Sequence, residues 1–114
     1  MRQGNDPAGQ SAPINARLYA ELWTSLASLL RSYAAFHGLP LDRAAAVEHD
    51  DRRIRVRHGK KLLILTRRHE IITWMRENGD GGTLELTAGG FLRGRRGEEP
   101  MDLAAERWAR ELMQ

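Results

Sequence analysis

The sequence predicts an α+β two-layer sandwich, made of a long N-terminal helix, an antiparallel meander of five or six strands and a C-terminal helix. Apolar residues recur every three or four positions over residues 15–37, alternate with polar ones over 44–95, and return to helical spacing after residue 100. The connections between the predicted strands are too short for parallel crossovers. Two amphipathic helices and one half-apolar sheet place both helices on one face and leave the other face open.

A chain of 114 residues is expected to form one domain. We assign this domain to residues 14–114 and predict that residues 1–13, which hold two glycines, two prolines and no apolar anchor, form a flexible tail. The N-terminus lacks a basic region followed by an apolar stretch, and no run approaches the roughly 20 apolar residues of a membrane span. We therefore expect a soluble, cytoplasmic protein.

The first helix is predicted to begin after an N-cap at Asn15 and to end at Gly38 and Pro40. Its opposite side carries small and mostly polar residues and is predicted to face solvent. The predicted buried stripe of this helix consists of Leu18, Leu22, Leu26, Leu29, Leu30 and Tyr33, widened by Tyr19, Trp23 and Phe36.

The strands are predicted from alternation and from turns between them, the clearest turn being "ENGDGG". The closing segment is predicted to be a helix with Pro100 at its first position and a buried stripe that includes Trp108. The predicted strands cover residues 44–49, 53–58, 61–67, 71–76, 83–87 and 91–95.

The net charge of +3 is unevenly distributed, because residues 43–96 carry thirteen cations and seven anions. The densest stretch is "RRIRVRHGKKLLILTRR", residues 52–68. On adjacent strands its cations are expected to gather on the open sheet face, either as a polyanion-binding patch or as a solvated face paired with neighbouring acids. No aromatic residue alternates with them to stack bases. The predicted patch comprises Arg53, Arg55, Arg57, Lys60, Lys61, Arg67 and Arg68.

The residue content argues against several kinds of chemistry. The chain has no cysteine, which excludes thiol nucleophiles, disulfides and cysteine-bound metals. The serines lie on a helix flank or in the tail, and no carboxylate pair is marked for acid–base work, so we expect a protein that is not an enzyme and needs no cofactor. Only one segment is rich enough in oxygen and imidazole ligands to be considered for a metal, and a charged turn is the commoner interpretation. It contains Glu48, His49, Asp50 and Asp51.

Several local features resemble the frataxin-like fold. "LYAELWTSLASLL" looks like the first helix of that family, "RRHEIITWMRENGDGG" is similar to its strand tryptophan with following glycines, and "PMDLAAERW" resembles its closing helix. The resemblance covers residues 16–113 and implies a helix, a meander and a helix. In frataxins an acidic ridge is held responsible for iron binding, whereas here the first helix carries one acid, Glu21, and "TRRH" stands where the family is polar. The resemblance therefore implies the fold but not the iron chemistry.

We expect a non-enzymatic interaction module that binds a protein partner through its open sheet face, with Trp74 as a candidate anchor. Trp74 is equally compatible with a place in the core. Homodimerisation through the open sheet or a strand edge is a further prediction. The alternatives are polyanion or nucleic-acid binding by the arginines and a frataxin-like role in metal handling.

Overall fold

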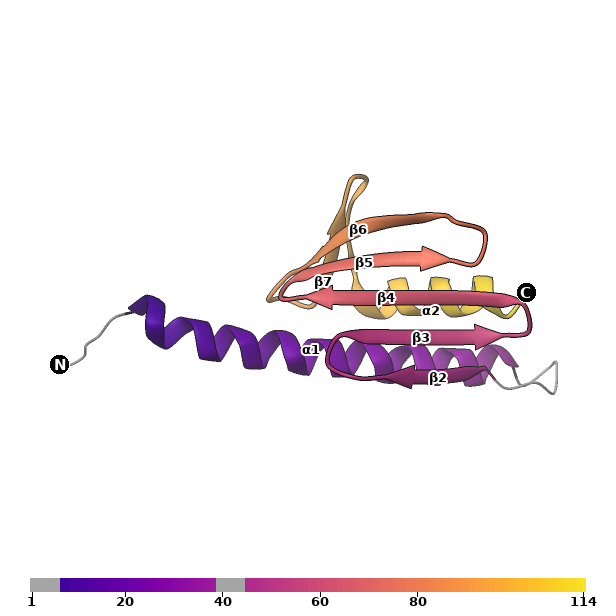
Figure 1. The fold of residues 1–114 in the computed structure, drawn as a ribbon, viewed down its shortest axis with the longest axis horizontal. Coiled ribbons are helices and arrows are strands. Elements are labelled where there is room, and N and C mark those ends of the chain that lie inside the picture. Colours follow the sequence, from indigo (N-terminus) through magenta and orange to yellow (C-terminus); the bar gives the residue numbers. More distant parts are fainter. Residues whose placement is uncertain (1–6, 39–44) are drawn as a thin grey trace.

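The computed structural model describes residues 7–38 and 45–114, with side chains from residue 16 onward. It confirms the predicted α+β class, because a helix is followed by one antiparallel open sheet and a second helix, in two layers. Both helices lie behind the same face of the sheet (Figure 1). The elements are α1 (Pro7–Gly38), β2 (Ala46–His49), β3 (Arg53–His58), β4 (Lys61–Arg68), β5 (Ile71–Arg76), β6 (Gly81–Leu86), β7 (Phe91–Gly94), β8 (Gly97–Pro100) and α2 (Met101–Leu112).

Helix α1 starts at Pro7, eight residues before the predicted N-cap at Asn15. Residues 7–13, which the sequence assigned to a tail, are therefore helical. Proline suits a first helical position, because the amide N–H that it lacks would have no partner within the helix. The N-terminal part of α1 extends beyond the sheet in Figure 1. The remaining tail residues and the predicted stop signal at Pro40 lie outside the described residues.

In the described residues the sheet has seven strands in sequential order, one more than the upper prediction. The additional strand is β8, which pairs with β7 from Gly94↔Gly97 to Phe91↔Pro100. Gly97 takes a φ of +117°, a conformation that side-chain-bearing residues rarely adopt. The segment "GEEP" has no alternation of apolar and polar residues, so periodicity gave no strand signal there. Pro100 consequently ends a strand and precedes α2, rather than opening the helix as predicted.

The core lies between the two helices and one face of the sheet. From the sheet, Ile54, Leu65 and Ile72 are completely buried, as are Leu26 and Leu30 from the predicted stripe of α1. Trp23 is also buried, and its Nε1–H donates to the backbone oxygen of Asp50 at 2.7 Å. Phe36 was predicted in this stripe but is 65% exposed.

Candidate functional site

Strand alternation places the first three predicted arginines together on the sheet face that the helices leave open. Ile54 and Val56 of β3 point into the core, so Arg53, Arg55 and Arg57 point the opposite way. Arg68 lies on this same face, because it alternates with buried positions of β4. Lys60 lies in the turn between these two strands and is exposed.

Lys61 and Arg67 lie on the helix-covered side, contrary to the prediction, because they share the alternation of the buried Leu63 and Leu65. The ammonium group of Lys61 donates to the carbonyl oxygens of Glu111 at 3.2 Å and Gln114 at 3.1 Å. It thereby satisfies carbonyls at the C-terminal end of α2, where a cation is favoured.

The guanidinium of Arg67 is likewise engaged within the fold. It stacks 5.8 Å from the ring centroid of Trp23 and donates to the backbone oxygen of Asp51 at 3.0 Å. The predicted seven-residue basic patch is therefore divided between two sides of the sheet.

The open face also carries exposed apolar side chains, which we call the apolar stripe: Ile64, Ile71 and Met75. Met75 is 58% exposed and Ile71 is 38% exposed, whereas Ile64 is partly covered. The register makes Ile64 the neighbour of both Arg55 and Met75 across the strands, and it pairs Ile71 with Arg68. Arginines therefore border the apolar stripe on the β3 and β4 side, and Glu85 lies across from Ile71 on β6.

Acidic residues pair with two arginines of the open face. Arg55 Nη2 lies 2.9 Å from Glu48 Oε1, and Arg93 Nη2 lies 2.8 Å from Glu85 Oε1. The hydrogen bond to Glu85 raises the pKa of Arg93 above its already high ordinary value. The Arg55–Glu48 pair matches the cross-strand pairing that the sequence suggested, whereas Arg93 lies outside the predicted patch.

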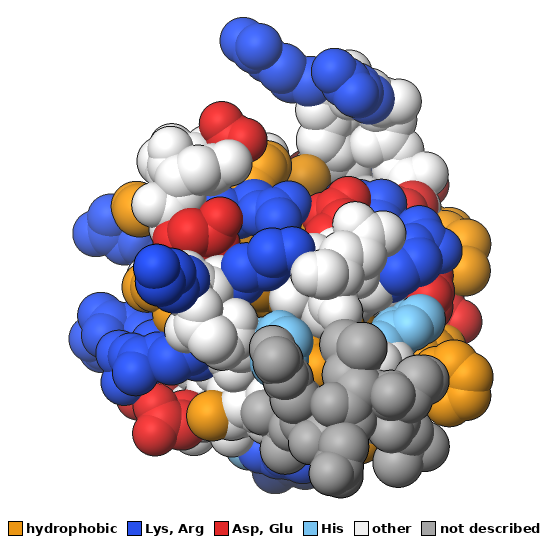
Figure 2. Space-filling view, turned by 90° about the vertical axis from the view of Figure 1, so that its right-hand side faces the viewer, with side chains coloured by type: hydrophobic (Ala, Val, Ile, Leu, Met, Phe, Trp, Pro, Cys, Tyr) orange, Lys and Arg blue, Asp and Glu red, His pale blue; other side chains and the backbone are white. Residues whose placement is uncertain are grey.

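The other cations of this face lack such partners. Within residues 16–38 and 45–114, no ion pair involves Arg53, Arg57, Lys60 or Arg68. Figure 2 shows Lys and Arg side chains gathered along its left-hand side, toward which the open sheet face turns in that view. The open face is thus a surface with both free positive charge and exposed apolar area.

The acidic segment considered for a metal spans the end of β2 and the turn that follows it. Asp50 Oδ1 accepts the backbone N–H groups of Arg52 at 2.8 Å and Arg53 at 2.9 Å, and these hydrogen bonds lower the pKa of Asp50. Glu48 is held by Arg55, and His49 Nδ1 lies 3.4 Å from an Arg31 nitrogen. Among the residues that the structure describes, no group of three or more histidines and acids could hold a metal ion.

Trp74 also lies on the helix-covered side, so it cannot anchor a partner on the open face. Its cross-strand neighbour is Gly82, and a Cβ at Gly82 would come within 2.8 Å of Trp74 Nε1. The absence of that Cβ lets the indole lie across β6. Trp74 packs partly against the core and is partly accessible.

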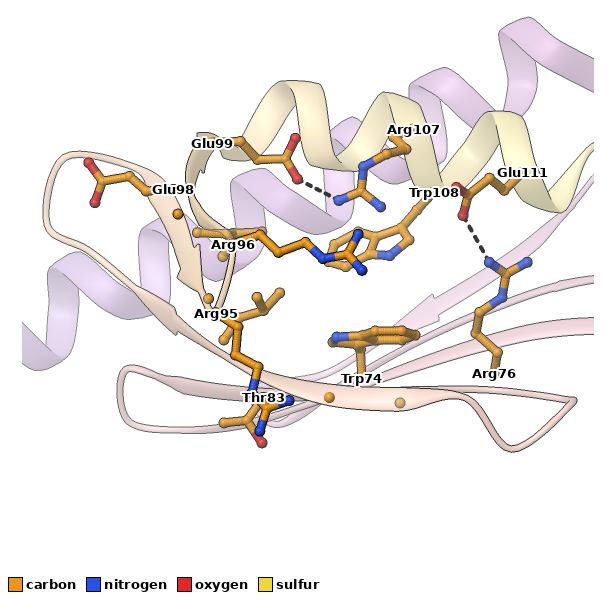
Figure 3. Close-up of a pocket in the computed structure, with 16 residues that line it drawn as sticks. Trp74, Arg76, Thr83, Arg95, Arg96, Glu98, Glu99, Arg107, Trp108 and Glu111 are labelled. Atoms are coloured by element: carbon orange, nitrogen blue, oxygen red, sulfur yellow. Dashed lines mark hydrogen bonds and ion pairs between the residues drawn. The ribbon is translucent and has the colours of Figure 1, made fainter.

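Above Trp74 is a groove of about 1160 Å³, which the sequence did not reveal and which we call the tryptophan groove. Strands β5 to β8 form its floor and wall, and Trp108 and Arg107 of α2 form its roof (Figure 3). The one sequence signal for this groove was the occurrence of Trp74 shortly before Gly81 and Gly82. That signal can be interpreted only when the register between β5 and β6 is known.

Charged groups from α2 and the sheet pair across the rim of the tryptophan groove. Arg76 Nη1 lies 2.8 Å from Glu111 Oε1, and Arg107 forms an ion pair with Glu99. The Arg107 guanidinium is also 5.5 Å from the ring centroid of Trp108. The two ion pairs connect α2 to β5 and to the edge strand β8.

Comparison with known proteins finds no matching protein-family model, no matching curated protein and no matching solved structure. The frataxin-like resemblance therefore stays a prediction. In the described part of the chain, no helix has the length and apolar character needed to cross a membrane.

Proposed function

We propose that this protein is a non-enzymatic binding module whose open sheet face docks an acidic protein surface with apolar side chains at its centre. The observation that carries the proposal is the apolar stripe itself, which combines exposed Met75 and Ile71 with bordering arginines. Exposed apolar side chains surrounded by polar ones are typical of protein interfaces.

The charge of the face supports an acidic partner. Arg53, Arg57 and Arg68 form no ion pair among the described residues, and therefore keep their positive charge available to a partner. Complementary charge around an apolar centre accelerates association and selects the orientation of docking.

The same features favour protein over nucleic acid. A phosphate backbone would pair with the arginines, but it would gain no binding energy from the aliphatic side chains of Ile64, Ile71 and Met75. Single-stranded bases need several aromatic side chains for stacking, and Phe91 of β7 is the one exposed aromatic side chain on the strands that the structure describes.

The test is a comparison of Met75→Glu with the wild-type protein. Met75 is exposed, so its replacement is expected to leave the fold intact while placing a charge at the centre of the docking face. Leu103→Glu is the matched control, because Leu103 is 55% exposed on α2 and lies away from the sheet face. Partners are first recovered by affinity purification and identified, and the affinity of each purified partner is then measured for all three proteins.

We expect an acidic protein whose affinity drops at least about tenfold with Met75→Glu, the loss typical of an interface centre, and stays unchanged with Leu103→Glu. Its affinity should also fall with Arg57→Ser and with rising salt. Equal binding by Met75→Glu would contradict the proposal. Salt-sensitive retention on nucleic acid that Met75→Glu leaves intact would support the alternative, and a dimer disrupted by Met75→Glu would identify a second copy as the occupant.

A further inference from the structure

We propose that the tryptophan groove binds a small planar aromatic anion, with its ring over the Trp74 indole and its acidic group at Arg96. This site is separate from the open sheet face, because Trp74 lies on the helix-covered side of the sheet. The two proposals therefore stand or fail independently.

The first supporting feature is the accessible aromatic surface of Trp74. One side of the indole faces Gly82, where any side chain would collide with it. Figure 3 shows the indole lying along the strand, with its other side directed toward α2 and the groove. Trp74 keeps partial exposure, although Trp23 and Trp108 are at most 3% exposed. A flat indole held in this way offers a surface for stacking an aromatic ring.

The second feature is a positive charge without a counter-ion at the same groove. Arg96 lies in the turn between β7 and β8 and forms no ion pair with any residue that the structure describes. In Figure 3 its side chain reaches from this turn toward the space between the Trp74 and Trp108 indoles. Of the other arginines that line the groove, Arg76 and Arg107 are paired with Glu111 and Glu99, and the side chain of Arg95 lies toward Thr83, away from α2, in Figure 3.

Together these features select the ligand class. A ring alone would gain stacking on Trp74, and an anion alone would gain only a contact with one exposed arginine. A ligand that joins an aromatic ring to a phosphate or carboxylate uses both groups at once, and a guanidinium suits either acid. A cationic ligand is not favoured, because the rim carboxylates of Glu111 and Glu99 are already paired with arginines.

The test measures binding of adenosine monophosphate by titration calorimetry and by NMR of the tryptophan indole N–H signals. Adenosine and inorganic phosphate are the matched probes, because each supplies one half of the ligand. We expect adenosine monophosphate to bind, to shift the Trp74 indole signal rather than those of Trp23 and Trp108, and to exceed both halves in affinity. Benzoate tests whether a carboxylate replaces the phosphate.

The variant that tests the anion contact is Arg96→Ser, with Arg57→Ser on the opposite face as a control of equal charge. Arg96→Ser should weaken binding about tenfold or more, as the loss of a charge-assisted contact does, whereas Arg57→Ser should not. Trp74→Leu should weaken binding to a similar degree, provided that its circular dichroism spectrum matches that of the wild-type protein. The NMR experiment needs no variant and so covers the case in which Trp74→Leu fails to fold.

An oligonucleotide of four adenines separates the two sources of such a ligand. An affinity equal to that of adenosine monophosphate identifies a free nucleotide, and a higher affinity that is still lost in Arg96→Ser identifies a single strand. The proposal is overturned if none of the aromatic anions shifts the Trp74 signal, or if Arg57→Ser and Arg96→Ser weaken binding equally.

Discussion

At the scale of single residues, one step along a strand decides on which face of the sheet a side chain lies, and therefore whether it is available for binding. Arg67 and Arg68 are adjacent in sequence, yet Arg67 stacks on the buried Trp23 and Arg68 lies on the open face. The same rule separates Trp74 from Met75, which lie on opposite sides of β5. A charge run in the sequence therefore overstates the charge that one face presents.

Gly82 shows how one missing side chain creates a site. In Gly82→Ala the new Cβ would lie 2.8 Å from Trp74 Nε1, so the indole must move. We expect a loss of at most about 1 kcal/mol in the free energy of unfolding, because Gly82 is exposed and the indole can shift toward the groove. Urea denaturation measures this loss, and the Trp74 indole N–H signal should shift. Thr83→Ala, one residue on and exposed, is the control; an equal loss there would contradict this explanation.

At the scale of secondary structure elements, β4 illustrates why the sheet has one buried and one open face. Leu63 and Leu65 are buried beneath the helices, and Thr66 next to them is exposed. The two helices supply the apolar cover, and α2 is held in place by the rim pairs Arg76–Glu111 and Arg107–Glu99. The alternation in the sequence therefore corresponds to one face that is buried under the helices and one face that is open to solvent.

The alternation in β4 is testable with a neighbouring pair of variants. Leu65→Ala should lower the free energy of unfolding by about 2–5 kcal/mol, because it removes buried methyl groups and leaves a cavity. Thr66→Ala should cost about 1 kcal/mol or less, since that side chain faces solvent. Chemical denaturation followed by circular dichroism gives both values. Similar losses for the two variants would mean that the open face is covered in solution.

At the scale of the whole molecule, the fold is a two-layer sandwich in which the two described helices cover one face of the seven-stranded sheet. Most of the sheet residues that are at most 1% exposed lie on β3, β4 and β5, at Ile54, Val56, Leu63, Leu65 and Ile72, and Leu86 of β6 is the remaining one. Strands β2 and β8 form the edges, and neither contributes a fully buried apolar side chain. Stability is therefore expected to decrease from the centre of the sheet toward its edges.

Native-state amide hydrogen exchange measures this gradient directly. We expect the slowest exchange at the hydrogen-bonded amides of β4, with opening free energies near that of global unfolding, and faster exchange in β2 and β8. The hydrogen-bonded amides of β5 provide an internal comparison, because they are also central. Protection of β8 equal to that of β4 would contradict the gradient.

The sequence by itself determined the fold class, because helical and strand periods can be recognised in the local sequence. It also placed Arg53, Arg55 and Arg57 on one side of a strand. It missed β8, whose residues have no apolar alternation, and it began α1 too late because the pattern around Asn15 resembled a helix start.

Only the tertiary structure decided which face each strand turns toward the helices, and therefore that Lys61 and Arg67 lie apart from the rest of the predicted patch and that Trp74 lies away from the open face. It also decided that Trp74, Trp108 and Arg96 meet at one groove. These residues come from β5, the turn between β7 and β8, and α2, and strand register together with helix packing brings them together. No local pattern contains that information, because proximity between distant segments depends on how the whole chain packs.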